Sequence, residues 1–204
     1  MKNTFKTIST KKINKLLSAY QSPKNPDYWQ RVFIDNNGYC YVINGIQITR
    51  MSANLLDLNN PDLNYIFIDD MAENEKPGGM IDFFNTTLKN LSSNGSAYTV
   101  DRTNLKNQLA YIKKEYKKGY HGIVSMQSPF SLKFGAKNEE SKALVNAQEL
   151  IGLLYLHPDR DITCITDSNP LKPIIIGNGT DNIVSILMPL RSADIEKMIC
   201  FEEI

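Results

Sequence analysis

Two short apolar runs near the end of the chain constrain the fold more than any other feature. Residues 172–177 read Lys-Pro-Ile-Ile-Ile-Gly, and residues 182–191 read Asn-Ile-Val-Ser-Ile-Leu-Met-Pro-Leu-Arg. Short apolar runs bounded by Gly, Pro and Asn are typical of buried strands. Because the intervening residues, Gly177 to Thr180, favour a turn, we expect these two strands to form a hairpin.

Apolar residues recur at helical spacing in four segments, residues 13–20, 80–91, 105–116 and 145–156. The third is the most regular and ends at Gly119, a residue that commonly caps helices. Strand patterns occupy residues 31–34, 39–43, 47–51, 65–68, 122–126, 131–134 and 161–165. The first two strands flank Asp35-Asn36-Asn37-Gly38, which predicts a hairpin because Asn and Gly tolerate positive φ.

The two halves of the chain share a broad order of elements, with an early helix, several strands and a second helix. Ser92-Ser93-Asn94-Gly95-Ser96 is the most linker-like stretch between the halves. The expected fold class is therefore α+β, with one domain over residues 1–95 and another over residues 96–204. A chain of 204 residues is long enough to give such domains real hydrophobic cores.

The net charge does not indicate binding to nucleic acid or to a membrane, because 23 Lys and Arg balance 22 Asp and Glu. The three cysteines, Cys40, Cys164 and Cys200, are widely spaced, so we expect neither a zinc site nor a disulfide framework. A reducing cytoplasm suits this cysteine usage. We also expect no signal peptide, no membrane-spanning segment, no metal and no cofactor.

The closing run Met188-Pro189-Leu190-Arg191, with the hairpin before it, resembles the carboxyl-terminal strands of bacterial DNA sliding clamps. Residues 97–102, before a helix, resemble the opening strand of the last clamp domain, and residues 144–150 resemble the entry to its second helix. Residues 42–48 are loosely similar to the family's Thr-Asp-Gly stretch, with Asn44 in place of the Asp. The family has three domains per subunit, whereas this chain has room for two.

The resemblance implies a DNA-clamp-like fold of two similar domains, each an antiparallel sheet with two helices gathered on one concave face. It also implies a groove for short peptides of DNA polymerase or other replication proteins at the last strand. The residues that would form this groove are Ile186, Met188, Pro189, Leu190 and Arg191. The alternative is that this segment is a plain edge strand, because Pro favours strand ends and edges.

Two helices carry basic residues opposite their apolar faces. With Leu105 at the centre of the buried face, a basic arc follows on the helix of residues 105–116, and the helix of residues 13–20 has a similar arc. The residues of the two arcs are Arg102, Lys106, Lys113, Lys114 and Lys117, and Lys11, Lys12 and Lys15. Lysines placed in this way suit sequence-independent contact with phosphates, although ordinary solvated helix faces look the same. The fourth helix exposes Gln148 and Glu149 and adds no lysine.

The resemblance, together with the basic arcs, implies a non-enzymatic, clamp-like protein that encircles or cradles double-stranded DNA and holds a polymerase or another enzyme on it. Two domains per subunit would suit a homo-oligomer, by analogy a trimeric ring. The alternative is a clamp-fold interaction module that does not encircle DNA. A third possibility is an enzyme that holds a metal ion at Asp69 and Asp70, which also read as an acidic turn. No other residues form a recognisable catalytic set.

Overall fold

The computed structural model describes residues 31–61, 63–101, 107, 123–126, 132–134, 143–157, 161–169, 171–177 and 182–189. Its strands are β1 (Val32–Ile34), β2 (Tyr39–Asn44), β3 (Gln47–Ser52), β4 (Tyr65–Phe67), β5 (Ser96–Asp101), β6 (Ile123–Met126), β7 (Leu132–Phe134), β8 (Ala143–Asn146), β9 (Asp161–Thr166), β10 (Ile174–Ile176) and β11 (Ile183–Leu187). The described helices are α2 (Gly78–Asn94) and α4 (Ala147–Leu156), with short 3-10 turns η2 (Ala53–Leu55), η3 (Ile68–Asp70) and η4 (Glu73–Glu75).

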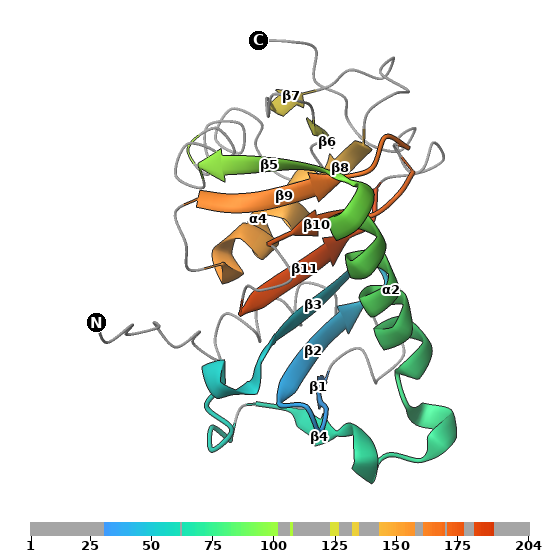
Figure 1. The fold of residues 1–204 in the computed structure, drawn as a ribbon. Helices are drawn as coiled ribbons and strands as arrows, with labels where there is room; N and C mark the ends of the chain where they lie inside the picture. Colours follow the sequence, from blue (N-terminus) through green and yellow to red (C-terminus); the bar gives the residue numbers. More distant parts are fainter. Residues whose placement is uncertain are drawn as a thin grey trace, which may run out of the picture.

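A twisted eight-stranded sheet, in the order β4-β1-β2-β3-β11-β10-β9-β5, forms the centre of the molecule (Figure 1). The predicted closing hairpin is confirmed, because β10 and β11 pair antiparallel from Ile174↔Leu187 to Ile176↔Ser185. All neighbouring strands of the large sheet pair antiparallel, except β1 and β4, which pair parallel. A smaller described sheet has the order β7-β6-β8. The mixed α+β class expected from the sequence is therefore confirmed.

The large sheet joins strands from both halves of the sequence. Strands β4 to β3 come from residues 1–95, strands β11 to β5 come from residues 96–204, and β3 pairs with β11 at the junction. Inside this junction the hydroxyls of Thr49 and Ser185 lie 2.8 Å apart and are buried. The two hydroxyls hydrogen-bond to each other, so neither is left buried without a partner. This pair favours one register between β3 and β11. The division into two domains remains a prediction.

The predicted β1–β2 hairpin is confirmed, and its turn depends on Asp35 and Gly38. The carboxylate of Asp35 accepts hydrogen bonds from the backbone N–H groups of Asn37 and Tyr39, each at 2.9 Å. Gly38 has φ of 77°, a left-handed conformation that strains a residue with a side chain. The turn residues therefore explain why the chain reverses at this point.

Two glycine replacements are expected to change stability in opposite directions. Gly38→Ala should lower the free energy of unfolding by about 1–2 kcal/mol, because alanine is strained at positive φ. Gly152 lies inside α4, and no atom lies within 4 Å of the position that an added Cβ would occupy. Gly152→Ala should therefore raise the free energy of unfolding by about 0.5–1 kcal/mol. Urea denaturation measures both changes, and a gain of stability in Gly38→Ala would contradict the turn geometry.

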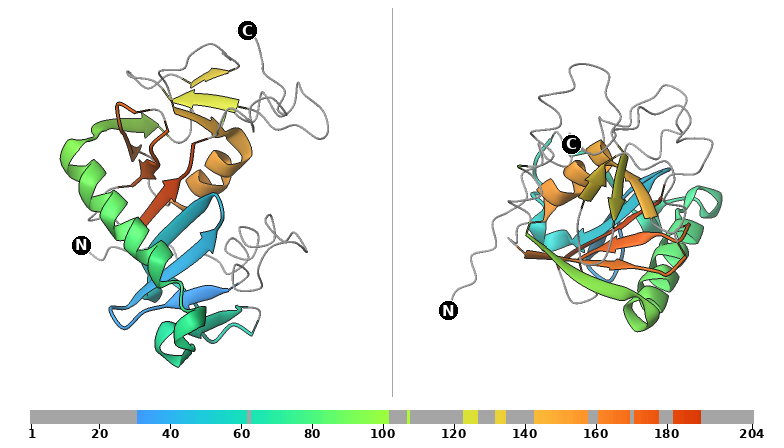
Figure 2. Two further views of the ribbon diagram at one scale, coloured as in Figure 1. Left: turned by 90° about the vertical axis from the view of Figure 1, so that its right-hand side faces the viewer. Right: turned by 90° about the horizontal axis from the view of Figure 1, so that it is seen from above.

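Alternating side chains on the large sheet enter two separate cores, one on each face. One core contains Val32, Val42, Ile174 and Ile176 from the strands, together with Leu150, Leu153 and Leu156 of α4. The other contains the intervening residues Phe33, Tyr41, Ile43, Ile175, Val184 and Ile186, together with Phe84, Leu88 and Leu91 of α2. Because neighbouring strand residues point to opposite faces, α2 and α4 cover opposite faces of the sheet (Figure 2).

This arrangement corrects the expectation that the helices gather on one face, at least for the two described helices. The predicted helices at residues 13–20 and 105–116 lie outside the described residues, apart from Asn107, which is helical. The expected two helices per domain are therefore not confirmed. Among the described helices, none has the length and apolar character needed to cross a membrane.

The sequence suggested a linker at residues 92–96, but the structure has the end of a helix and the start of a strand there. Helix α2 continues to Asn94 and β5 begins at Ser96. The Ser93 hydroxyl donates to the carbonyl of Lys89 at 3.0 Å, so this serine is satisfied inside the helix rather than in a loop. At Gly95 an added Cβ would lie 2.6 Å from Ile165 on β9, so the chain turns here in close contact with the sheet.

The fourth predicted helix also begins later than expected. Its first expected residue, Val145, belongs to β8 and is fully buried, and α4 starts at Ala147. A buried valine fits both the hydrophobic pattern of a strand and that of a helix. Local spacing therefore cannot show where the strand ends and the helix begins. The expected end of the helix at Leu156 is confirmed.

Candidate partner and nucleic-acid interfaces

The predicted partner-binding segment lies in the middle of the large sheet rather than at its edge. Strand β11 pairs with β10 on one side and with β3 on the other, so the edge-strand interpretation of this segment is wrong. Ile186 is 1% exposed, whereas Met188 and Pro189 beyond the strand are half-buried. Leu190 and Arg191 lie outside the described residues. Of the three described residues of the segment, Met188 and Pro189 are therefore the accessible ones, and the partner-binding role of the segment remains a prediction.

The accessible end of β11 lies beside the turn between β2 and β3. The backbone N–H of Met188 donates to the carbonyl of Ile46 at 2.9 Å, which extends the β3–β11 pairing by one bond. Ile46 is 38% exposed, so Ile46, Met188 and Pro189 together form a partly exposed apolar surface. The sequence pattern included Ile46 in a clamp-like stretch but gave no reason to select it as a partner contact.

Helix α2 covers the face of the sheet to which Ile186 belongs. Phe84 is fully buried and meets Tyr41 edge to face, with ring centroids 6.1 Å apart. The guanidinium of Arg50 lies 4.6 Å from the ring of Tyr39 and 5.4 Å from that of Phe84. Burial raises the pKa of Tyr41 to about 12, so this residue stays a neutral phenol at physiological pH. These contacts fix α2 across the strands and leave Ile186 beneath it.

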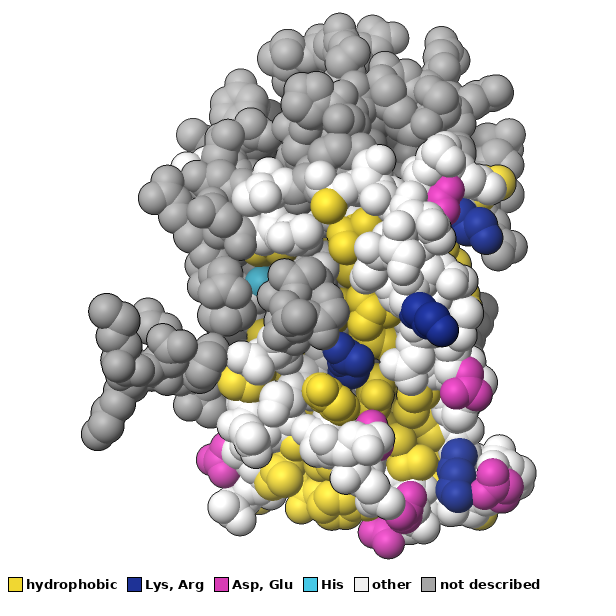
Figure 3. Space-filling view, viewed as in Figure 1, with side chains coloured by type: hydrophobic (Ala, Val, Ile, Leu, Met, Phe, Trp, Pro, Cys, Tyr) yellow, Lys and Arg dark blue, Asp and Glu magenta, His cyan; other side chains and the backbone are white. Residues whose placement is uncertain are grey.

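The basic residues predicted to contact DNA all lie outside the described residues. They are Lys11, Lys12, Lys15, Arg102, Lys106, Lys113, Lys114 and Lys117. On the part of the surface that is described, acidic side chains outnumber basic ones around β4 and the start of α2 (Figure 3). Acidic groups repel phosphates, so any DNA contact must come from another part of the chain.

Asp69 and Asp70, the residues of the metal-enzyme alternative, lie exposed in η3. The Asp69 carboxylate accepts a hydrogen bond from the side-chain amide of Asn36, which links η3 to the β1–β2 hairpin. Among the described residues, no three His, Cys, Asp or Glu side chains come close enough to hold a metal ion. The position of Asp69 fits the acidic-turn interpretation of this pair.

Glu149 in the first turn of α4 is half-buried, which corrects the expectation that this helix exposes it. Burial raises the pKa of its carboxyl group from 4.5 to about 7. The folded protein therefore favours the neutral acid, and the resulting stability is present below pH 4.5 and lost as the pH rises through about 7.

Glu149→Gln is expected to remove this pH dependence, because glutamine stays neutral. The melting temperature of the variant should exceed that of the parent protein at about pH 8 and match it at about pH 4. Thermal denaturation followed by circular dichroism at both values measures the difference. A variant that is less stable than the parent at the higher pH would show that the ionised carboxylate is favoured in the fold.

No protein-family model matches the chain, and no curated protein matches it either. Solved structures of similar fold are bacterial DNA polymerase III beta subunits. That of Pseudomonas aeruginosa has a TM-score of 0.55 and 13% identity, over 93% of this chain and 70% of its own. That of Borrelia burgdorferi, solved with a natural product, has a TM-score of 0.50 and 11% identity, over 90% of this chain. The match spans 62% of the Borrelia protein, less than two thirds of its length. At this identity the likeness establishes the fold and not the activity.

Proposed function

We propose that this protein is a sliding-clamp-like scaffold, which binds double-stranded DNA and holds a replication protein on it without catalysis of its own. The observation that carries the proposal is the fold, which follows the beta subunit of Pseudomonas aeruginosa over 93% of the chain. A clamp acts through its shape, so the proposal needs no catalytic side chains. It requires a basic surface for the phosphates and a separate surface for a partner.

The two surfaces come from different parts of the chain. The basic arc of residues 102–117 supplies the phosphate contacts, and the surface of Ile46, Met188 and Pro189 receives a short apolar peptide of a polymerase or another replication protein. Methionine suits such a surface because its flexible side chain adapts to different peptides. The carboxyl-terminal motif that suggested partner binding thus acts through its end rather than through Ile186.

Oligomerisation completes the proposed clamp. Among the described strands, β4 and β5 are the outermost members of the large sheet, and each pairs with a strand on one side only. An outermost strand offers backbone groups to a further strand, so two copies can join edge to edge.

The alternative function is a clamp-fold interaction module that does not encircle DNA. Two observations favour it: α2 and α4 lie on opposite faces of the sheet, and the described surface near β4 is acidic. In such a module the partner surface is kept and the ring is not formed. The two functions predict different masses in solution and different responses to DNA.

Mass measurement combined with DNA binding tests the proposal. Light scattering should give a mass of two or more chains, and the affinity for a random-sequence duplex should fall steeply with added salt. Binding should be equal for unrelated sequences, because phosphate contacts do not read bases. A monomer with no measurable affinity for the duplex at low salt would contradict the proposal and favour the alternative function, the interaction module.

A further inference from the structure

A cavity of about 570 Å³ opens where the chain enters α2, on the same side of the sheet as that helix. It is lined by Arg31, Met71, Asn74, Glu75, Lys76, Pro77, Gly79 and Met80. None of these residues belongs to the predicted partner surface. A volume of this size is typical of sites that enclose a small ligand or one or two side chains of a peptide.

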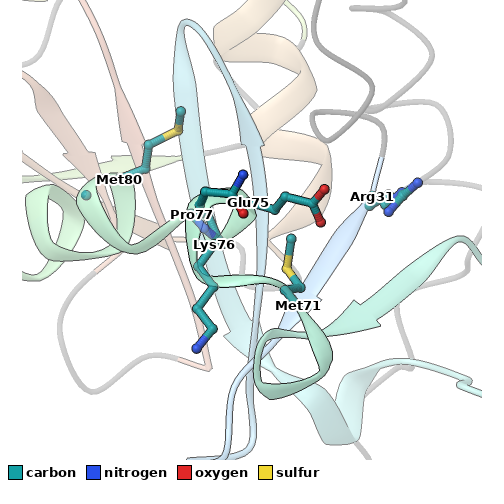
Figure 4. Close-up of a pocket in the computed structure, with 8 residues that line it drawn as sticks. Arg31, Met71, Glu75, Lys76, Pro77 and Met80 are labelled. Carbon is teal, nitrogen blue, oxygen red and sulfur yellow. The ribbon is translucent and has the colours of Figure 1, made fainter.

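The apolar part of the cavity consists of two methionines and a proline. Met71 is 8% exposed, Pro77 is buried, and Met80 is half-buried in the first turn of α2. Figure 4 shows Met71, which precedes η4, and Met80, in α2, on either side of Pro77. Flexible thioethers of this kind accommodate apolar side chains of varied shape.

The segment that supplies most of the cavity lining is acidic. Residues 69–82 contain the five acids Asp69, Asp70, Glu73, Glu75 and Asp82, with Lys76 as their only basic residue. The ammonium group of Lys76 lies 2.7 Å from Glu73 and points away from the methionines (Figure 4). Arg31 lies at the opposite rim, where Glu75 extends toward it (Figure 4). Four further acids in this segment, Asp69, Asp70, Glu73 and Asp82, are exposed.

We propose that this cavity is a docking site for a partner protein segment that presents an apolar side chain flanked by lysine or arginine. The apolar side chain would enter between Met71 and Met80, and the flanking cations would face the exposed acids of η3, η4 and α2. Charge complementarity of this kind selects the partner and speeds its encounter, while the buried anchor supplies most of the affinity. The residues that line this site are different from those of the peptide-binding surface proposed above.

Fluorescence anisotropy with three short synthetic peptides tests the site on the full-length protein. One peptide has a Leu-Phe centre flanked by lysines, the second has the same centre flanked by glutamates, and the third has a Ser-Ser centre flanked by lysines. We expect the first to bind at least about tenfold more tightly than either of the others, because it alone has both anchor and charge. Equal binding of the two lysine peptides would mean non-specific attraction and would overturn the proposal.

Two pairs of variants locate the binding. Glu75→Lys and Met80→Gln change residues that line the cavity, whereas Asp57→Lys and Leu171→Gln make the same kinds of change at exposed residues that do not line it. The first two should weaken binding of the Leu-Phe lysine peptide by about tenfold, and the controls should leave it unchanged. If the controls weaken binding as much, or if no variant changes it, the peptide binds elsewhere and the assignment fails.

Discussion

Phe84→Ala is expected to lower the free energy of unfolding by about 3–5 kcal/mol, the largest effect of any single replacement considered for this chain. Phe84 is 0% exposed and is the largest α2 side chain in the core on that face of the sheet. Its removal leaves a cavity beneath α2 and removes the Phe84 ring that both Tyr41 and Arg50 contact. Because the same core reaches β1, β2, β10 and β11, the loss should affect the whole sheet and not the helix alone.

Phe83→Ala is the matched control, because Phe83 precedes Phe84 on the same helix and is 41% exposed. It should change the free energy of unfolding by less than about 1 kcal/mol. Urea denaturation of both variants, followed by tryptophan fluorescence and by circular dichroism, measures the difference. Equal losses in the two variants would show that α2 does not pack on the sheet through the face that contains Phe84.

Neutralising the basic arc is expected to have the second large effect, on the affinity for DNA. The triple variant Lys106→Gln, Lys113→Gln and Lys117→Gln removes three of the proposed phosphate contacts. The slope of log affinity against log salt should become shallower by about 0.9 for each contact that is lost, so the low-salt affinity falls by orders of magnitude. The binding of DNA of every sequence should weaken equally, because lysine–phosphate contacts carry no base information.

Lys89→Gln provides a control for this variant. Lys89 is an exposed lysine on α2, on the face of the sheet opposite α4, and it is not part of either basic arc. Its neutralisation should leave both the affinity and the salt slope nearly unchanged. If the triple variant binds DNA with the slope of the parent protein, the basic arc is an ordinary solvated helix face and the alternative interpretation of those lysines is correct.

The parts of the fold that the sequence predicted are those with a local physical cause. The β1–β2 hairpin follows from Asp35 and Gly38, and the β10–β11 hairpin follows from apolar runs bounded by turn formers. The pairing of β3 with β11 connects residues far apart in the chain, so no local pattern could predict it. That pairing is what makes β11 a central strand and corrects the interpretation of it as an edge.

The extent of the helices was less predictable, for reasons that individual residues make clear. Ser92, Ser93 and Asn94 resemble a linker by composition, but the Ser93 hydroxyl bonds back to the helix and the close contact of Gly95 with Ile165 ends it. Burial of Glu149 could not be read from its charge, because burial depends on what covers the first turn of α4. Seven of the eight residues that line the cavity next to α2 lie within residues 71–80, and Arg31 alone is brought to it by tertiary packing.

Retention on closed circular DNA tests the proposed clamp function most directly. A ring that surrounds DNA is held by topology, so it should stay bound to a closed circle in salt high enough to abolish ordinary phosphate contacts. Cutting the same circle at one site should release it, because the ring can then slide off an end. We predict retention on the closed circle and loss after the cut, measured by gel filtration in the presence of any loading factor required. Equal release from closed and cut DNA would contradict encirclement.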